Sequence, residues 1–219
     1  MTDEFLDFVG RRMSRPYFAF LNYFDAHKPY DPPPEVMTGF GSEPGARDRC
    51  DASYAGIDAE IGRLVAALRE NGTLNNTVIV VTADQGELCG EHGLYEHTSN
   101  LYLPVLHVPL IVRYPSRVPS GCRVTAPVSL RDLAATLTDL SGLTLADPFP
   151  GVSLAAHFPD DGAATTTPVF AAVERGIRSD SGLPFTKGAM QSLLDRRWQL
   201  IRTVGMDERE LYDYRADRA

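Results

Sequence analysis

The feature that most constrains the fold is a set of three short apolar runs, each ended by polar or turn-forming residues. These runs, at residues 17–24, 76–82 and 108–113, are rich in aromatic or β-branched side chains. Such runs are typical of strands buried on both faces, as in a parallel sheet that helices cover. Residues 51–71 and 130–141 have apolar side chains at three- and four-residue steps, which predicts amphipathic helices. The order of these elements predicts an α/β fold with a mostly parallel sheet sandwiched by helices.

A change in composition after Leu145 divides the chain into three predicted parts. Residues 1–145 carry the α/β pattern. Residues 146–167 are rich in Asp, Pro, Gly, Ala and Thr, which is typical of a linker or surface excursion. Residues 168–219 contain short strand candidates without strong helices between them, which predicts a small antiparallel C-terminal subdomain. The strand candidates are residues 168–174, 190–194 and 198–204.

Charge and length argue against several classes of protein. The 219 residues carry a formal net charge of −8, whereas a nucleic-acid-binding face needs clustered cations. No apolar run approaches the ~20 residues of a membrane-spanning helix, and residues 1–8 lack the basic start and apolar stretch of a signal peptide. Cys50, Cys89 and Cys122 are odd in number and widely spaced, so we expect no disulfide framework. We therefore expect a globular protein without nucleic-acid or membrane partners, cytoplasmic by default.

Polar side chains that could bind a ligand follow two of the predicted strands. His27 comes shortly after the first run, whereas Asp84 and Gln85 follow the second after one alanine and open a loop that continues to His97. Ligands of an open parallel sheet bind beyond the carboxyl ends of its strands, so we expect these residues at one edge. Carboxylate and amide oxygens suit a hard cation such as Ca²⁺ or Mg²⁺ better than zinc. The two histidines could donate hydrogen bonds to an anionic group or protonate a leaving group.

Spacing alone also allows a simpler interpretation of these residues, and it favours that interpretation. Asp84 would cap a turn, Gln85 would be solvated, and His27 and His97 would be ordinary loop residues. We expect His92, in the segment Gly-Glu-His-Gly, to be structural and to hydrogen-bond the backbone of its own loop.

Several segments, in chain order, resemble the sulfatase family of the alkaline phosphatase superfamily. Residues 18–33, FAFLNYFDAHKPYDPP, resemble the family segment in which a strand delivers an active-site histidine before a proline-rich loop. Residues 54–64, YAGIDAEIGRL, and 76–93, NTVIVVTADQGELCGEHG, look like the family's central helix, strand and metal loop. The resemblance continues through residues 106–112, 128–143, 151–154, 197–201 and 210–213.

This resemblance implies an alkaline-phosphatase-like fold and metal-assisted hydrolysis of a sulfate ester, with a small molecule or carbohydrate as the sulfated partner. The family holds a divalent metal, usually Ca²⁺, with two early aspartates and a later pair of ligands, and Asp84 and Gln85 match the later pair. His27 and His97 match family positions that contact the oxygens of the ester. The alternatives are a phosphomonoester or phosphodiester hydrolase of the same superfamily, and a truncated, non-catalytic anion-binding protein.

Two parts of the family pattern have no match in this sequence. The family nucleophile is a Cys or Ser in a C-x-P-x-R type motif, and none of the three cysteines stands in such a setting. The early aspartate pair is also unmatched, because Asp160 and Asp161 form the only Asp-Asp and lie in a Pro/Gly-rich stretch of the wrong region. We therefore expect the C-terminal portion of a sulfatase, with the N-terminal part of the fold missing and no nucleophile in this chain. A separate N-terminal half chain is a candidate partner.

Overall fold

The computed structural model describes residues 1–11, 15–40, 44–97, 100–158, 167–176 and 183–216. The chain divides into two compact units, Met1–Asn76 and Thr77–Ala219, and each is described by itself. The division of the chain at residues 145 and 167 stays a prediction. Within the described residues, no helix has the length and apolar character needed to cross a membrane.

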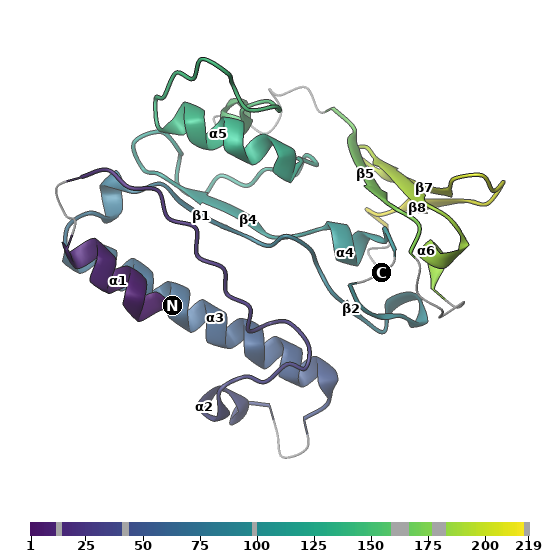
Figure 1. Ribbon diagram of the computed structural model, residues 1–219, viewed down its shortest axis with the longest axis horizontal. Coiled ribbons are helices and arrows are strands. Elements are labelled where there is room, and N and C mark those ends of the chain that lie inside the picture. Colours follow the sequence, from purple (N-terminus) through teal and green to yellow (C-terminus); the bar gives the residue numbers. More distant parts are fainter. Residues whose placement is uncertain (12–14, 41–43, 98–99, 159–166, 177–182, 217–219) are drawn as a thin grey trace. The chain divides into compact units, whose positions relative to one another are not determined.

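The first unit is built around the long helix α3 (Ala46–Glu70), which confirms the predicted helix and begins five residues before it. Its buried side chains include Cys50, Leu64 and Leu68. The helix ends where the Asn71 N–H donates to the Ala67 carbonyl and the chain turns left-handed at the next glycine. The shorter elements are α1 (Thr2–Arg11), α2 (Pro34–Met37) and η1 (Leu74–Asn76), shown in Figure 1.

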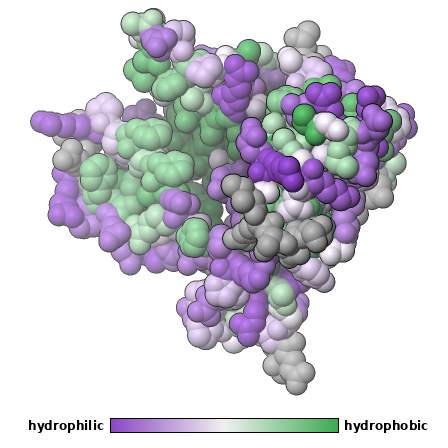
Figure 2. Space-filling model, turned by 45° about the vertical axis from the view of Figure 1, so that its right-hand side comes forward, coloured by the Kyte–Doolittle hydropathy of each residue, from purple (hydrophilic) through white to green (hydrophobic). Residues whose placement is uncertain are grey.

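The aromatic run 17–24 was predicted to be a buried strand, and the structure contradicts this. All of these residues are described, and none of them is in a strand. Tyr17 contacts Phe5 and Phe8 of α1 edge-on, with ring centroids 6.0 and 5.9 Å apart, while Phe18 and Phe20 are 79% and 81% exposed. Apolar composition predicts burial only where a partner surface is present, and in this unit α1 covers one side of the segment. Figure 2 shows that hydrophobic residues reach the molecular surface.

The second unit contains a two-stranded sheet of β1 (Ile79–Thr82) and β4 (Leu110–Arg113), at the positions of the second and third predicted strands. The two strands are antiparallel, with Val80 opposite Val112. Every strand pair in the described part of the chain is antiparallel, so the structure does not show the predicted mostly parallel sheet. A parallel pair needs a crossover connection, usually a helix. The connection from β1 to β4 instead contains a hairpin and a one-turn helix.

That hairpin consists of β2 (Leu88–Cys89) and β3 (Tyr95–Glu96), joined by the 3₁₀ turn η2 (Glu91–Gly93). The one-turn helix α4 (Leu103–Leu106) follows it. The predicted helix at 130–141 is confirmed as η3 (Leu130–Asp132) and α5 (Leu133–Leu140), against which η4 (Leu154–His157) packs.

The antiparallel strands predicted for the C-terminal part are confirmed, and they form a four-stranded sheet in sequence order. Its elements are β5 (Val169–Val173), α6 (Pro184–Lys187), β6 (Met190–Leu194), β7 (Trp198–Thr203) and β8 (Arg209–Asp213). Alternate residues of β7 are buried, as expected for a sheet with one face on a core. Met190 and Ile201 of this face form a buried cluster with Leu101 and Tyr102, which directly precede α4.

Candidate functional site

The loop that follows β1 carries the predicted metal ligands and is fixed immediately after them. Asp84 and Gln85 are both exposed. The next N–H, that of Gly86, donates to the Val105 carbonyl oxygen over 2.8 Å. A Cβ on Gly86 would lie 2.0 Å from the Pro104 carbonyl oxygen, so only glycine permits this approach to α4. The close backbone contact therefore sets where the acid and amide side chains begin.

His97, the predicted substrate contact, is held by a carboxylate that sequence reasoning did not select. Its Nδ1 lies 2.9 Å from Oε2 of Glu87, and the two side chains are only 16% and 10% exposed. An ionised carboxylate can only accept, so Nδ1 carries the hydrogen of this bond, which fixes the orientation of the ring. The pair closes the base of the β2–β3 hairpin, because Glu87 directly precedes β2 and His97 directly follows β3.

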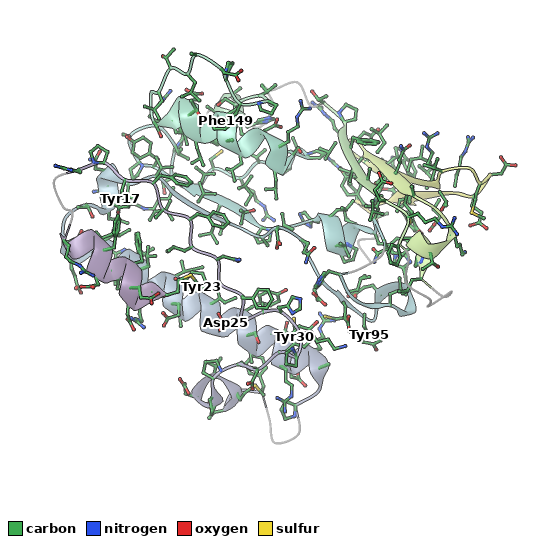
Figure 3. All side chains as sticks on the ribbon, in the orientation of Figure 1. Tyr17, Tyr23, Asp25, Tyr30, Tyr95 and Phe149 are labelled. Atoms are coloured by element: carbon green, nitrogen blue, oxygen red, sulfur yellow. The ribbon has the colours of Figure 1, made fainter. Side chains whose placement is uncertain are left out.

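His27 lies in the first unit, in a tight turn that follows the aromatic segment. The His27 N–H donates to the Phe24 carbonyl (3.0 Å), and the His27 carbonyl accepts from the Tyr30 N–H (3.1 Å). Its ring stacks on Phe24 at 4.6 Å, and Nδ1 is 2.8 Å from the Lys28 carbonyl oxygen. Because a carbonyl only accepts, Nδ1 again carries the hydrogen. Figure 3 shows Asp25 and Tyr30, which lie within the same turn.

Three of the four predicted site residues, Asp84, Gln85 and His97, lie in the segment between β1 and α4 of the second unit, whereas His27 belongs to the first. Glu87 was overlooked because nothing local distinguishes it from a solvated acid. The available signal was its position, directly after the Asp-Gln-Gly segment and ten residues before His97. Only the hairpin brings these two side chains together.

The donor set at the loop fits part of the shell of a hard cation. Asp84 and Gln85 offer a carboxylate and an amide oxygen, the ligand types that Ca²⁺ and Mg²⁺ prefer. Among the described residues, no group of three or more His, Cys, Asp or Glu side chains is placed to hold a metal. Ca²⁺ takes about 6–8 oxygen ligands. These two residues therefore supply a minority of the oxygens, and other donors would complete the coordination.

An acid and an amide directly after a strand, followed by a carboxylate-held histidine, are the kinds of residues that metal-dependent hydrolases use. Comparison with known proteins identifies the class. The model of the sulfatase family matches residues 1–143, well over half of the 219 residues. The chain belongs to the sulfatase family, whose members generally use a divalent metal.

Two curated relatives illustrate this membership. The chain is 35% identical over 111 residues to an N-acetylglucosamine-6-O-sulfatase of Bacteroides thetaiotaomicron, an alignment that covers 51% of the chain and 20% of the relative. It is 39% identical over 103 residues to arylsulfatase K of Danio rerio, covering 47% of the chain and 19% of the relative. The chain thus spans about a fifth of the length of each relative.

Two solved structures are similar over most of the chain. One is a protein in complex with its substrate D-glucosamine-2-N,6-O-disulfate, with a TM-score of 0.64 and 28% identity, covering 78% of this chain and 34% of the other. The second is the phosphonate monoester hydrolase of Agrobacterium radiobacter, with a TM-score of 0.72 and 22% identity, covering 99% of this chain and 54% of the other. The second likeness is one of fold alone.

Proposed function

We propose that the chain supplies the metal-holding and ester-contacting part of a sulfatase active site, which acts in hydrolysis of a sulfate ester. The observation that carries this proposal is the Glu87–His97 pair on the hairpin that follows Asp84 and Gln85. Family membership supports the reaction class, because the same loop lies inside the matched residues 1–143.

In this proposal Asp84 and Gln85 hold a divalent metal, Ca²⁺ in preference to Mg²⁺. Ca²⁺ accepts a flexible set of oxygen ligands, which suits two adjacent exposed donors better than the strict octahedron of Mg²⁺. When bound, the metal would neutralise negative charge on the ester oxygens and on the transition state. Gly86 contributes indirectly, because its hydrogen bond to Val105 holds the backbone that carries both ligands.

His97 contacts the ester in this proposal, and the hydrogen bond between its Nδ1 and Oε2 of Glu87 sets the orientation of its ring. The carboxylate fixes the ring orientation, and a protonated imidazole can donate a hydrogen bond to an ester oxygen or a proton to the leaving oxygen. His27 is the second residue proposed to contact the ester oxygens, and the hydrogen bond from its Nδ1 to the Lys28 carbonyl orients its ring.

A sulfated sugar is the proposed substrate class. One curated relative is named an N-acetylglucosamine-6-O-sulfatase, and one structural neighbour is complexed with a disulfated glucosamine as its substrate. A phosphonate or phosphate ester is the second candidate, supported by the fold likeness to a phosphonate monoester hydrolase. The nucleophile comes from outside these 219 residues, because no cysteine here stands in a C-x-P-x-R setting. A separate N-terminal half chain is one proposed source.

Calorimetric titration with CaCl₂ tests the metal ligands. Asp84→Asn and Gln85→Leu should each weaken Ca²⁺ binding by at least about tenfold, whereas Asp147→Asn, an exposed acid elsewhere in the second unit, should not. Equal affinity of all these variants, or no Ca²⁺ binding by the unsubstituted chain, would overturn the metal assignment.

Binding of 4-nitrophenyl sulfate in the presence of Ca²⁺ tests the ester contact. His97→Ala and Glu87→Ala should weaken binding, and Glu87→Gln should restore part of it because its amide oxygen can still accept from Nδ1. His107→Ala, an exposed histidine of the same unit, is the control. Tighter binding of 4-nitrophenyl phosphate or an aryl phosphonate would favour the second candidate. Release of nitrophenolate by the chain alone would contradict the absence of a nucleophile.

A further inference from the structure

The tip of the β2–β3 hairpin packs against two aromatic side chains, Tyr102, which directly precedes α4, and Tyr212 of β8. The His92 ring stacks on Tyr102 with centroids 3.8 Å apart and planes 10° from parallel. Tyr212 of β8 stands edge-on to both rings, 5.6 Å from His92 and 6.1 Å from Tyr102. His92 was predicted to be structural and to hydrogen-bond the backbone of its own loop, and its ring also contacts Tyr102 and Tyr212 outside that loop.

The backbone of His92 makes this contact informative. His92 has a φ of 53°, in the left-handed region that residues with a Cβ avoid, and Gly90 and Gly93 beside it also have positive φ. A glycine at position 92 would meet the backbone requirement with less strain. The imidazole at this position therefore indicates a role for its contacts with the two tyrosines, which a glycine would lack.

The two tyrosines are themselves firmly placed. Tyr102 is 9% exposed and belongs to the buried cluster with Met190 and Ile201. The Tyr212 hydroxyl donates to Oε2 of Glu210. Burial raises the pKa of both phenols, and the Glu210 carboxylate raises each further, so the rings stay neutral around pH 7.

A buried amide ties the Tyr102 segment to the same sheet. Nε2 of Gln199, a residue 1% exposed on β7, donates to the Leu101 carbonyl over 2.7 Å and to the Ser192 hydroxyl over 3.0 Å. In the sheet register Gln199 lies opposite Tyr212. The C-terminal sheet therefore fixes the positions of the two tyrosine rings that the His92 ring contacts.

The tip is connected to the candidate site by a short and well-bonded hairpin. At the tip, the Gly90 N–H donates to the Leu94 carbonyl (2.9 Å) and the Cys89 N–H donates to the Glu91 carboxylate (2.6 Å). The strands pair directly below, and the Glu87–His97 contact closes the base. A displacement of the tip therefore also displaces the base, because the hairpin between them is short and hydrogen-bonded.

We propose that Tyr212 and His92 are positioning residues of the candidate site, through which the C-terminal sheet holds the hairpin that aligns His97 with Glu87. The inference rests on the proposed function for its catalytic meaning. The contact between the sheet and the hairpin tip can be tested without substrate or metal.

The test measures amide hydrogen exchange at residues 88–97 of the chain without ligand, together with urea unfolding. Tyr212→Leu and His92→Gly should each speed exchange in the hairpin by about tenfold, the loss of one to two aromatic contacts. Tyr212→Phe, which keeps the ring, should retain most of the protection. Tyr214→Leu is the matched control, because Tyr214 follows β8 and its hydroxyl donates to the Asp195 carbonyl.

Unchanged hairpin exchange in Tyr212→Leu, or equal acceleration in Tyr214→Leu, would overturn the inference, because hairpin order would then be independent of Tyr212 or would follow general sheet stability. His92→Gly distinguishes most sharply between a His92 that is only locally strained and a His92 that positions the hairpin. A purely local strained residue would gain stability when its positive φ is relieved, whereas a positioning residue loses hairpin protection. Affinity for 4-nitrophenyl sulfate in the presence of Ca²⁺ is the second readout. It should fall about tenfold in the same variants whose hairpin exchange becomes faster. If the unsubstituted chain binds no aryl sulfate but exchange changes as expected, the proposed function is wrong, whereas the conclusion that His92 and Tyr212 order the hairpin still holds.

Discussion

Gly86 offers the sharpest test of how the candidate loop is held, because one methyl group separates the observed backbone from a steric clash. In Gly86→Ala the new Cβ would lie 2.0 Å from the Pro104 carbonyl oxygen, whereas Cβ atoms essentially never come within 3.0 Å of such an atom. The partner is backbone, so no side-chain rotation relieves the clash. The loop and α4 must therefore separate by about 1 Å, which also stretches the hydrogen bond from Gly86 to Val105.

The expected loss of stability follows from these two effects. Overpacking against a well-fixed neighbour typically costs about 1–3 kcal/mol. The weakened backbone hydrogen bond adds about 0.5–1.5 kcal/mol. We therefore expect Gly86→Ala to lower the free energy of unfolding of the second unit by about 1.5–4.5 kcal/mol, a large part of the total of an ordinary domain. The Ca²⁺ affinity should fall together with the stability, because Asp84 and Gln85 belong to the displaced backbone segment.

Gly62→Ala is the matched control, with the same chemical change and the opposite expected sign. Gly62 lies inside α3, and nothing comes within 4 Å of a Cβ built on it. Alanine should stabilise that helix by about 0.5–1 kcal/mol. Urea unfolding followed by fluorescence of Trp198, the single tryptophan, reports on the second unit, and circular dichroism at 222 nm reports on the helix. A Gly86→Ala protein with an unchanged or higher urea midpoint would refute the reasoning.

Three further predictions concern packing, pH and the exposed aromatic segment. Thr136→Val should cost about 1–3 kcal/mol in urea unfolding, because the buried Thr136 hydroxyl accepts from the Leu154 N–H (2.9 Å) and valine leaves that donor unmet; Thr138→Val, whose hydroxyl only donates to the Ala134 carbonyl, should change little. The Ser153 hydroxyl and then Arg117 lower the pKa of Asp139 below its ordinary 3.8, so this carboxylate contributes stability above about pH 4 that is lost as pH falls through the lowered value. The drop in urea midpoint from pH 7 to pH 3 should then be smaller in Asp139→Asn, and an equal drop would contradict the assignment. Phe18→Ser with Phe20→Ser should slow aggregation measured by light scattering without lowering the unfolding midpoint, since both rings are exposed; unchanged aggregation would show that the segment is not responsible.

The sequence predicts the regular elements well because each has a period that local side chains impose. Helices α3 and α5 and the C-terminal strands β5, β6 and β7 lie where apolar spacing places them. The direction in which β1 and β4 pair is different, because apolar content marks a strand as buried without specifying its neighbour. The same limit applies to residues 17–24, whose composition predicts a buried strand that the structure does not contain.

The candidate site divides in the same way. Asp84, Gln85 and His97 stand out in the sequence because they follow a strand and match a family loop. Glu87 and Tyr212 do not stand out, since the first matters only through a hairpin contact and the second through a side chain more than a hundred residues away from His92. Pairings of this kind depend on tertiary structure, and no local pattern encodes them.

Backbone conformation explains why the contacts of the β2–β3 hairpin cannot be predicted from local sequence. Positive φ values are expected at glycine, yet His92 and Glu96 adopt φ of 53° and 70° within the hairpin. Such conformations persist only where the surroundings compensate for them, and they gather at functional sites. The stack of His92 on Tyr102 and the pairing of Glu96 with Leu88 are the compensating contacts. The strained residues thus lie at the hairpin tip and directly before His97, so the segment that departs furthest from local preference is also the one to which the proposed chemistry is assigned.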